Sequence, residues 1–361
     1  MPPKVFIIGG TGAQGIPVIQ GLVSDKAYTT RVLTRDINSS RAKSLLALGN
    51  VKLIEGTFAN EDDLHKGFRG CDYAFVNIDG FNAGEKTEMF WSMRAYEIAI
   101  EEGVRFFVFG NLDYGYKKGG YDPRFRTGHY DGKGRIAEWI LHQTKDNGKK
   151  MGAAIFTTGP YIQMTLGKST PMSPVVEDGV VVWRVPLGQG AVPHVSLEDC
   201  AHYVRWLFDH QYEANGMDLE VAIDHIDYHT LAKAFTAVTG KPAKYIDTDL
   251  ESYWKTGPLS AGASRPAGYN ADVNDLATLT MQENFTGFWN LWKHSGGNQG
   301  VVRRDYALLD RIHPKRIRSA EEWFRLEDER GRKAGLGGLF ERAADLKPVL
   351  KIAEDGRKGK I

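Results

Sequence analysis

The sequence predicts an α/β fold, with a doubly wound parallel sheet and a smaller C-terminal α+β lobe that interleaves with it. Over the first 160 residues, short and almost wholly apolar strands alternate with helical stretches, which is typical of a parallel sheet covered on both faces. A glycine-rich turn joins the first strand to the first helix, and beyond residue 160 the alternation loosens. We therefore divide the 361 residues into a sheet unit at 1–160, a lobe at 161–325 and a charged tail at 326–361.

The elements follow from apolar runs and helical spacing. Predicted strands cover 4–8, 30–35, 51–54, 73–76, 106–109 and 153–158, with shorter ones near 180–183 and 192–195. Predicted helices cover 16–22, 42–48, 85–102, 198–209, 229–238 and 273–293, and another begins at Glu61, where acidic residues favour a helix start. Residues 256–268, rich in Gly, Ser and Pro, are expected to form a mobile loop.

The first turn has the form of a phosphate-binding loop. Gly9, Gly12 and Gly15 follow a strand and open a helix. The glycines permit a tight turn, a close approach of the backbone to a pyrophosphate and close packing of helix on strand. The helix N–H groups then point at the phosphates. A Rossmann-type dinucleotide site is therefore predicted, with cofactor contacts from Gly9, Thr11, Gly12, Ala13, Gln14 and Gly15.

The end of the second strand indicates which dinucleotide binds. Thr34 and Arg35 stand where an acid usually holds the ribose 2′-hydroxyl of NAD. A guanidinium forks onto a phosphate and always carries its charge, so the sequence favours NADP(H), with Arg35 on the 2′-phosphate and Arg41 as a second cation. Asp36 leaves the alternative of a 2′-hydroxyl contact open.

Composition narrows the classes of function. The 46 Lys and Arg residues balance 45 Asp and Glu for a net charge of +1, which favours neither nucleic acid nor an anionic membrane. Two cysteines, Cys71 and Cys200, cannot form a disulfide framework and are expected to be buried thiols. No apolar run is long enough to span a bilayer or to act as a signal peptide. We expect a cytoplasmic protein, or a nuclear one if it is regulatory.

Several motifs together resemble the NmrA-like family of atypical short-chain dehydrogenases/reductases. The resemblance covers residues 3–325, and its motifs are the glycine loop, residues 31–35, residues 104–109, residues 129–134 and the late pairs His313-Pro314 and Glu322-Trp323. It implies an NADP(H)-binding unit at 1–160 and a substrate lobe at 161–325. It also implies that Asn77, after the fourth strand, and Tyr161, after the sixth, lie beside the cofactor.

The resemblance directs attention to His129 and Lys133. A standard member of the wider superfamily has Tyr-x-x-x-Lys on a helix, which places both groups on one face, and a serine after the fifth strand. Here Lys133 is present, His129 replaces the tyrosine, and the serine region reads Gly110-Asn111-Leu112. In an active enzyme, Lys133 and His129 are the candidate catalytic residues, because a desolvated lysine or a histidine can supply a proton. Tyr130 is a weaker candidate, since it turns about 100° away on a helix.

Three interpretations remain. The first, which we favour, is an NADP(H)-dependent oxidoreductase acting on a small carbonyl, imine or enone, with aromatic compounds among the candidates and secondary metabolism as one setting. The second is a non-catalytic NADP(H)-sensing regulator of the NmrA type that binds a protein partner. The third is an inert structural relative. The loop 113–128 is expected either to overhang the nicotinamide as a substrate loop or to be solvated.

The remaining motifs do not point to other chemistry. His225 and His229 lack a third ligand, so no metal site is predicted. The basic clusters 303–304 and 315–318 are expected to form a solvated or partner-facing surface, without direct contact to nucleic acid. The aromatic stripe in 273–293 is read first as packing, with a substrate-facing lid as the alternative.

Overall fold

The computed structural model describes the chain except for residues 148, 347–349, 352–355 and 358–359. Its main sheet has seven strands in the order β10-β6-β5-β4-β1-β2-β3, and every pair in it is parallel. The strands are β1 (Lys4–Ile8), β2 (Thr29–Thr34), β3 (Val51–Glu55), β4 (Tyr73–Val76), β5 (Phe106–Leu112), β6 (Gly152–Thr158) and β10 (Asp218–Glu220). The doubly wound parallel sheet is thus confirmed, with one strand contributed from beyond residue 160.

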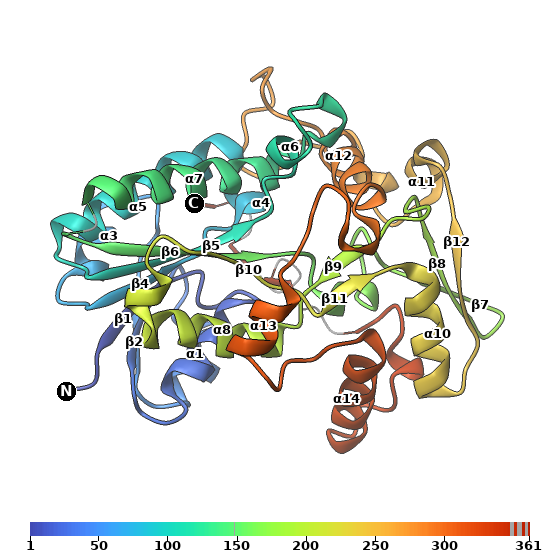
Figure 1. Ribbon diagram of the computed structural model, residues 1–361, viewed down its shortest axis with the longest axis horizontal. Helices are drawn as coiled ribbons and strands as arrows, with labels where there is room; N and C mark the ends of the chain where they lie inside the picture. Colours follow the sequence, from blue (N-terminus) through green and yellow to red (C-terminus); the bar gives the residue numbers. More distant parts are fainter. Residues whose placement is uncertain (148, 347–349, 352–355, 358–359) are drawn as a thin grey trace.

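Helices cover both faces of this sheet, as Figure 1 shows. One face carries α1 (Gly15–Val23) and α8 (Leu197–Asp209), and the other carries α3 (Glu61–Phe68), α5 (Glu85–Glu101) and α7 (Gly128–Asn147). Each layer has its own apolar core. Because parallel strands all end at the same edge, the loops that follow them gather there. The short elements of this half are α2 (Ser40–Leu46), α4 (Gly80–Ala83), α6 (Gly115–Lys118), η1 (Pro123–Phe125), η2 (Ile162–Thr165) and α9 (Gln211–Ala214).

The C-terminal region adds two small sheets and a third core. One sheet has the order β12-β8-β7 and the other pairs β11 with β9. The strands are β7 (Val175–Glu177), β8 (Val180–Val185), β9 (Val192–His194), β11 (Asp224–Ile226) and β12 (Ala243–Asp247). The helices are α10 (Tyr228–Thr239), α11 (Leu250–Thr256), η3 (Ser260–Gly262), α12 (Met281–Lys293), η4 (Gly296–Asn298), α13 (Tyr306–Ile312), α14 (Ala320–Lys333) and η5 (Phe340–Arg342). Large aromatic side chains fill the core between them.

Two predicted elements differ from the structure. The helix predicted at 273–293 begins only at Met281, because Thr280 caps it and Glu283 completes a capping box. The tail predicted to start at 326 is helical there, since α14 runs through that position. Beyond it, Leu339 and Leu346 are buried in the third core. The part of the predicted tail at 347–349, 352–355 and 358–359 lies outside the described residues.

Candidate cofactor and substrate site

A continuous cavity of about 420 Å³ lies at the carboxyl edge of the main sheet. One end is formed by the glycine loop and by Arg35 after β2. The middle is formed by residues 77–82 after β4, by Lys133 and by residues 159–161 after β6. The far end is apolar and includes Phe285 and Phe288 of α12. The cavity therefore joins a phosphate-binding loop to an aromatic compartment.

The glycine loop is shaped by contacts that exclude side chains at two positions. Gly9 has a φ of +84°, and a Cβ there would stand 2.2 Å from the carbonyl oxygen of Asn77. A Cβ at Gly15 would stand 2.3 Å from the Gly9 oxygen, which is how closely α1 packs on the strand end. A Cβ at Gly12 would meet only the Gly9 oxygen, at 3.0 Å. Gly12 is thus open on the cavity side, where a pyrophosphate would approach.

The N-terminus of α1 is left without a side-chain cap. Gln14 occupies the cap position but makes no capping hydrogen bond. Its Oε1 instead accepts from Asn77 Nδ2 at 2.8 Å, which links the glycine loop to the end of β4. Uncapped N–H groups at a helix start attract an anion. The predicted contacts Thr11, Ala13 and Asn77 line the same cavity.

Arg35 lines the cavity directly after β2, whereas Asp36 does not line it. Asp36 is used locally, because its Oδ1 accepts from the Asn38 N–H at 2.8 Å. Arg41 Nη1 donates to the Thr11 carbonyl at 3.4 Å, so it stands on the same side as Arg35. A cation rather than a carboxylate faces the position expected for the ribose 2′ group.

The C-terminal segment reaches this end of the cavity. Arg35 Nη1 donates to the carbonyl oxygen of Arg357 at 3.2 Å and to that of Lys360. Lys351 lines the cavity and donates to Thr11 Oγ1 at 3.1 Å. In Figure 1 the C-terminus accordingly lies beside α4, where Asn82 Nδ2 donates to Lys360 O at 3.2 Å. The predicted tail therefore supplies part of the cofactor end of the cavity.

Lys133 is held by three acceptors at the middle of the cavity. Its Nζ lies 2.7 Å from Glu88 Oε1, 3.0 Å from Asn77 Oδ1 and 2.8 Å from Ile78 O. An ammonium group has three N–H donors, and its hydrogen bonds go to Asn77 Oδ1, Ile78 O and, at 3.4 Å, Gly110 O. The contact with Glu88 is an ion pair without a hydrogen bond. Lys133 is thus oriented by the protein at the wall of the cavity.

His129 lies at the junction with the aromatic compartment. Its Nδ1 is 3.0 Å from Asn284 Oδ1 and its ring packs 4.6 Å from Phe81 and 5.4 Å from Phe285, centre to centre. Since a carboxamide oxygen can only accept, Nδ1 carries the proton and Nε2 is the acceptor. Desolvation lowers the pKa of His129 to about 4, against the opposing Asn284 bond. At neutral pH the ring is therefore uncharged, which disfavours His129 as the proton donor.

Three polar residues lie near the positions of the missing tyrosine and serine. Tyr130 is buried against Phe288 and Trp292, and burial raises its pKa well above the usual range. Asn111, at the serine position, is buried and donates to Thr157 Oγ1 at 2.8 Å. Tyr161 lines the cavity at the end of β6, as expected, and burial raises its pKa. The raised pKa values keep both phenols protonated, so neither has the lowered pKa of an activated tyrosine.

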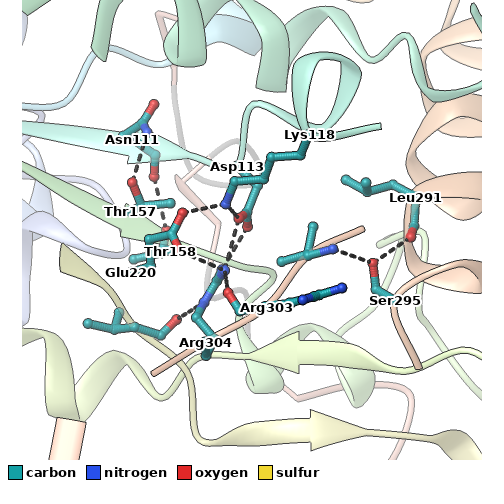
Figure 2. A network of polar contacts seen from close by, with 12 residues as sticks. Asn111, Asp113, Lys118, Thr157, Thr158, Glu220, Leu291, Ser295, Arg303 and Arg304 are labelled. Carbon is teal, nitrogen blue, oxygen red and sulfur yellow. Dashed lines mark hydrogen bonds and ion pairs between the residues drawn. The ribbon is translucent and has the colours of Figure 1, made fainter. Parts of the chain in front are cut away.

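The loop 113–128 does not line the cavity, contrary to the expectation of a substrate loop, whereas much of it is exposed, as the alternative of a solvated loop expects. Its first residue is the exception, because the Asp113 side chain points into a buried ion cluster (Figure 2). Its carboxylate accepts from Arg304 at 2.7 and 2.9 Å and from Lys118 at 2.8 Å, and Lys118 also pairs with Glu220. Burial alone would raise the pKa of Asp113, but the two cations hold it well below its usual range.

The basic motifs are exposed only in part: Arg303, Lys315 and Arg318 are exposed as expected, whereas Arg304 and Arg316 are not. Arg304 is 4% exposed and Arg316 is 5% exposed, so neither belongs to a solvated or partner-facing surface. Arg316 Nη1 donates to Ile223 O at 2.6 Å, which ties the late segment to β11. His225 is also occupied, since its two ring nitrogens lie 2.7 Å from Tyr306 Oη and 3.1 Å from Val302 O.

Three further features bear on other kinds of site. Among the described residues, no group of three or more His, Cys, Asp or Glu side chains is placed to hold a metal. No helix in the described part of the chain is long and apolar enough to cross a membrane. Both cysteines are buried free thiols, as expected.

Three residues of the site were not foreseen from sequence. Glu88 is a charged residue inside the predicted helix 85–102, Asn284 sits in a glycosylation-like triplet, and Lys351 belongs to the charged tail. The helical spacing of Met89, Met93 and Tyr96 predicted α5 but gave no reason to place a carboxylate inward. Only the pairing of a buried acid with the inward lysine reveals Glu88.

Comparisons with known proteins agree with this geometry. The sequence profile of the NmrA-like family matches residues 1–284. The NmrA-like family domain-containing oxidoreductase lnaB of Aspergillus flavus is 26% identical over 261 residues, which is 67% of this chain and 74% of that protein.

Solved structures extend the likeness across the fold. The structure of NmrA, a negative transcriptional regulator, in complex with NADP has a TM-score of 0.69 at 15% identity and covers 92% of this chain and 98% of its own. The NADPH complex of the quinone oxidoreductase QOR2 of Escherichia coli has a TM-score of 0.65 at 18% identity, covering 89% and 98%. Neighbours of this fold are thus crystallised with NADP(H).

Proposed function

This chain belongs to the NmrA-like family, and we propose that it is an NADP(H)-dependent oxidoreductase that passes hydride to a small aromatic electrophile. The observation that carries the proposal is the continuity of the cavity, which runs from the glycine loop and Arg35 to Phe285 and Phe288. A dinucleotide laid along the strand ends would place its adenine ribose at Arg35 and its pyrophosphate at Gly12. Its nicotinamide would then lie near Tyr161 and Lys133, at the entrance to the aromatic compartment.

The protonation states of the site narrow the substrate class. Reduction of a neutral carbonyl needs a hydride at carbon and a proton at oxygen. Lys133 has its three N–H groups engaged by Asn77, Ile78 and Gly110, and His129 is uncharged with an acceptor at Nε2. Hydride addition to a cationic iminium, by contrast, consumes the positive charge and needs no proton. The site therefore fits an aromatic iminium better than a ketone, with His129 Nε2 available to a donor group of the substrate or to water.

The aromatic compartment supplies the binding surface for such a ligand. Phe81 and Phe285 are stacked at 5.9 Å with an interplanar angle of 4°. Phe288 stands edge-on to Phe285 at 5.4 Å. Ring faces attract cations as well as other aromatic rings, so a planar cationic ligand is favoured over a neutral aliphatic one.

A direct assay tests the proposal. NADPH oxidation is followed with 2-methyl-3,4-dihydroisoquinolinium and with 1-tetralone, a neutral ketone of similar shape. We expect turnover with the iminium, dependent on enzyme and NADPH, and much slower turnover with the ketone. Faster reduction of the ketone would show that the site supplies a proton after all.

A second candidate is a non-catalytic NADP(H)-sensing regulator that binds a protein partner. The engaged Lys133 and the uncharged His129 favour this candidate, because a site in which neither group is a free acid can hold the dinucleotide and leave it unchanged. NmrA, described as a negative transcriptional regulator, shares the fold. Such a protein would bind NADP+ and NADPH but oxidise no NADPH with any member of an aldehyde, imine, iminium and quinone panel. For the enzyme we expect a cytoplasmic location. A nuclear location is expected only if the protein is the regulator.

A further inference from the structure

A buried carboxylate lies directly behind the cofactor site. Glu88, on the first turn of α5, is 0% exposed, and its Oε1 lies 2.7 Å from Lys133 Nζ. Within the described part of the chain, neither of its oxygens has a hydrogen-bond partner, so the ion pair with this ammonium is the contact that compensates the buried charge. A Cβ at Gly80 would stand 2.3 Å from Oε2, so the segment after β4 closes over the carboxylate.

The surroundings offer neither Glu88 nor Lys133 another charged partner. An unpaired charge in such a place is strongly destabilising, whichever partner is removed. The other charges near it do not replace either partner. Glu85, on the same helix, carries the same charge as Glu88 and is occupied by Arg126 and Arg135. Asp79, in the segment after β4, is another acid whose pKa is raised by desolvation, so it offers Glu88 no counter-charge. Desolvation also raises the pKa of Glu88, against the opposing effect of Lys133.

The three contacts of Lys133 differ in strength. The contact with Glu88 is ionic, whereas Asn77 Oδ1 and Ile78 O are neutral acceptors. Two opposite charges 2.7 Å apart and away from water attract each other more strongly than an ammonium attracts a neutral oxygen. When ribose hydroxyls arrive beside Lys133, the neutral acceptors are therefore the ones to be exchanged, and the ion pair with Glu88 remains.

We propose that Glu88 is the positioning residue of the cofactor site, which keeps the Lys133 ammonium charged and anchored while its other N–H groups turn to the nicotinamide ribose. This inference rests on the proposed NADP(H) site but not on turnover. Glu88 does not touch the cofactor and acts only through Lys133.

The test is the pH dependence of NADPH binding, measured by quenching of protein fluorescence between pH 6.5 and 10. Glu88→Gln keeps the shape of the side chain and removes its charge. Without the counter-charge, burial drives the proton off Lys133 at lower pH, because desolvation penalises the charged form. We expect the loss of affinity at alkaline pH to begin at least about one pH unit lower than in the wild type. Glu97→Gln, on the exposed side of the same helix, should leave the profile unchanged.

Two further variants keep the result decisive. Lys133→Met should remove the shift, so that Glu88→Gln has no additional effect on the pH profile in its presence. If Glu88→Gln alone does not fold, the double variant Glu88→Gln/Lys133→Met should fold with a higher melting temperature, because it leaves no unpaired buried charge.

The outcomes separate this inference from the proposed function. A Glu88→Gln profile that coincides with the wild type overturns the positioning role, as does a double variant no more stable than the single one. If the wild-type protein binds no NADPH, the proposed function fails. The melting temperatures of the four proteins still decide in that case whether Glu88 and Lys133 are coupled.

Discussion

At the scale of single residues, the site separates groups that recognise the cofactor from groups that shape the loop. Arg35 faces the expected ribose 2′ position, while Asp36 is turned into a local hydrogen bond with the Asn38 N–H. Gly9 and Gly15 are closed by backbone atoms, and Gly12 is open toward the cavity. Two substitutions follow from this difference, one for the phosphate and one for the loop.

Arg35→Glu places a carboxylate beside the 2′-phosphate. NADPH binding should weaken by at least about 1.5–3 kcal/mol, the value of a hydrogen bond to a charged group. NADH lacks the 2′-phosphate and serves as the internal control, since its affinity should change little. Calorimetric titration of both cofactors checks this, and equal weakening would show that Arg35 does not read the phosphate.

Gly12→Val should abolish dinucleotide binding and leave the melting temperature close to that of the wild type. The added side chain would meet only the Gly9 oxygen at 3.0 Å, yet it fills the approach of a pyrophosphate. Gly15→Val is the matched contrast, because its Cβ would lie 2.3 Å from the Gly9 oxygen and should destabilise the fold. Thermal denaturation with and without NADPH separates the two, and unimpaired NADPH binding by Gly12→Val would remove Gly12 from the site.

At the scale of elements, the cluster of Asp113, Arg304 and Lys118 fastens the C-terminal region to the end of β5 (Figure 2). Arg304→Met leaves Asp113 buried with Lys118 alone. We expect a loss of about 3–5 kcal/mol in the free energy of unfolding, as for other broken buried pairs. Urea titrations measure it, and Asp113→Leu/Arg304→Met should recover part of the loss. A single variant as stable as the wild type would contradict this role.

The cluster also determines how the free energy of unfolding depends on pH. The pKa of Asp113 is lower in the folded chain than in the unfolded one, so its contribution is present above the unfolded value of about 3.9 and is lost as the pH falls below it. Arg304→Met removes most of the cause of that shift. Urea titrations of both proteins between pH 3 and 6 should therefore show a shallower decline for the variant.

The C-terminal segment gives a second prediction at this scale. Carbonyl oxygens of Arg357 and Lys360 occupy donors of Arg35 that a 2′-phosphate would need. A chain ending at Leu346 should therefore bind NADPH more tightly than the full chain, with a smaller change for NADH. Titration of both cofactors against both chains checks this, and weaker NADPH binding by the shortened chain would show that the segment assists the cofactor.

The elements also show what sequence patterns can predict here. The apolar strands, the glycine turn and the end of β2 are local signals, so the sheet and the phosphate end of the cavity follow from them. Arg304 and Arg316 read as surface residues because their partners are distant in sequence, and β10 is too short to stand out. Glu88 was missed for the same reason: its pairing with Lys133 depends on how α5 packs against α7.

At the scale of the whole molecule, one cavity connects two parts of the chain that could serve different functions. The sheet supplies the dinucleotide site, and the C-terminal region supplies the aromatic compartment around His129. A regulator needs only the first part. An enzyme needs both, held so that the nicotinamide faces the ligand, and the account requires that hydride crosses between them.

The most direct test follows that hydride. The protein is incubated with 2-methyl-3,4-dihydroisoquinolinium and NADPH carrying deuterium at C4 of the nicotinamide, in separate experiments with each of the two stereochemical forms. The account predicts deuterium at C1 of the amine product from one form only, because the site presents a single face of the ring. Binding of NADPH without transfer of deuterium from either form, to this compound or to any of the aldehyde, imine and quinone panel, would contradict it.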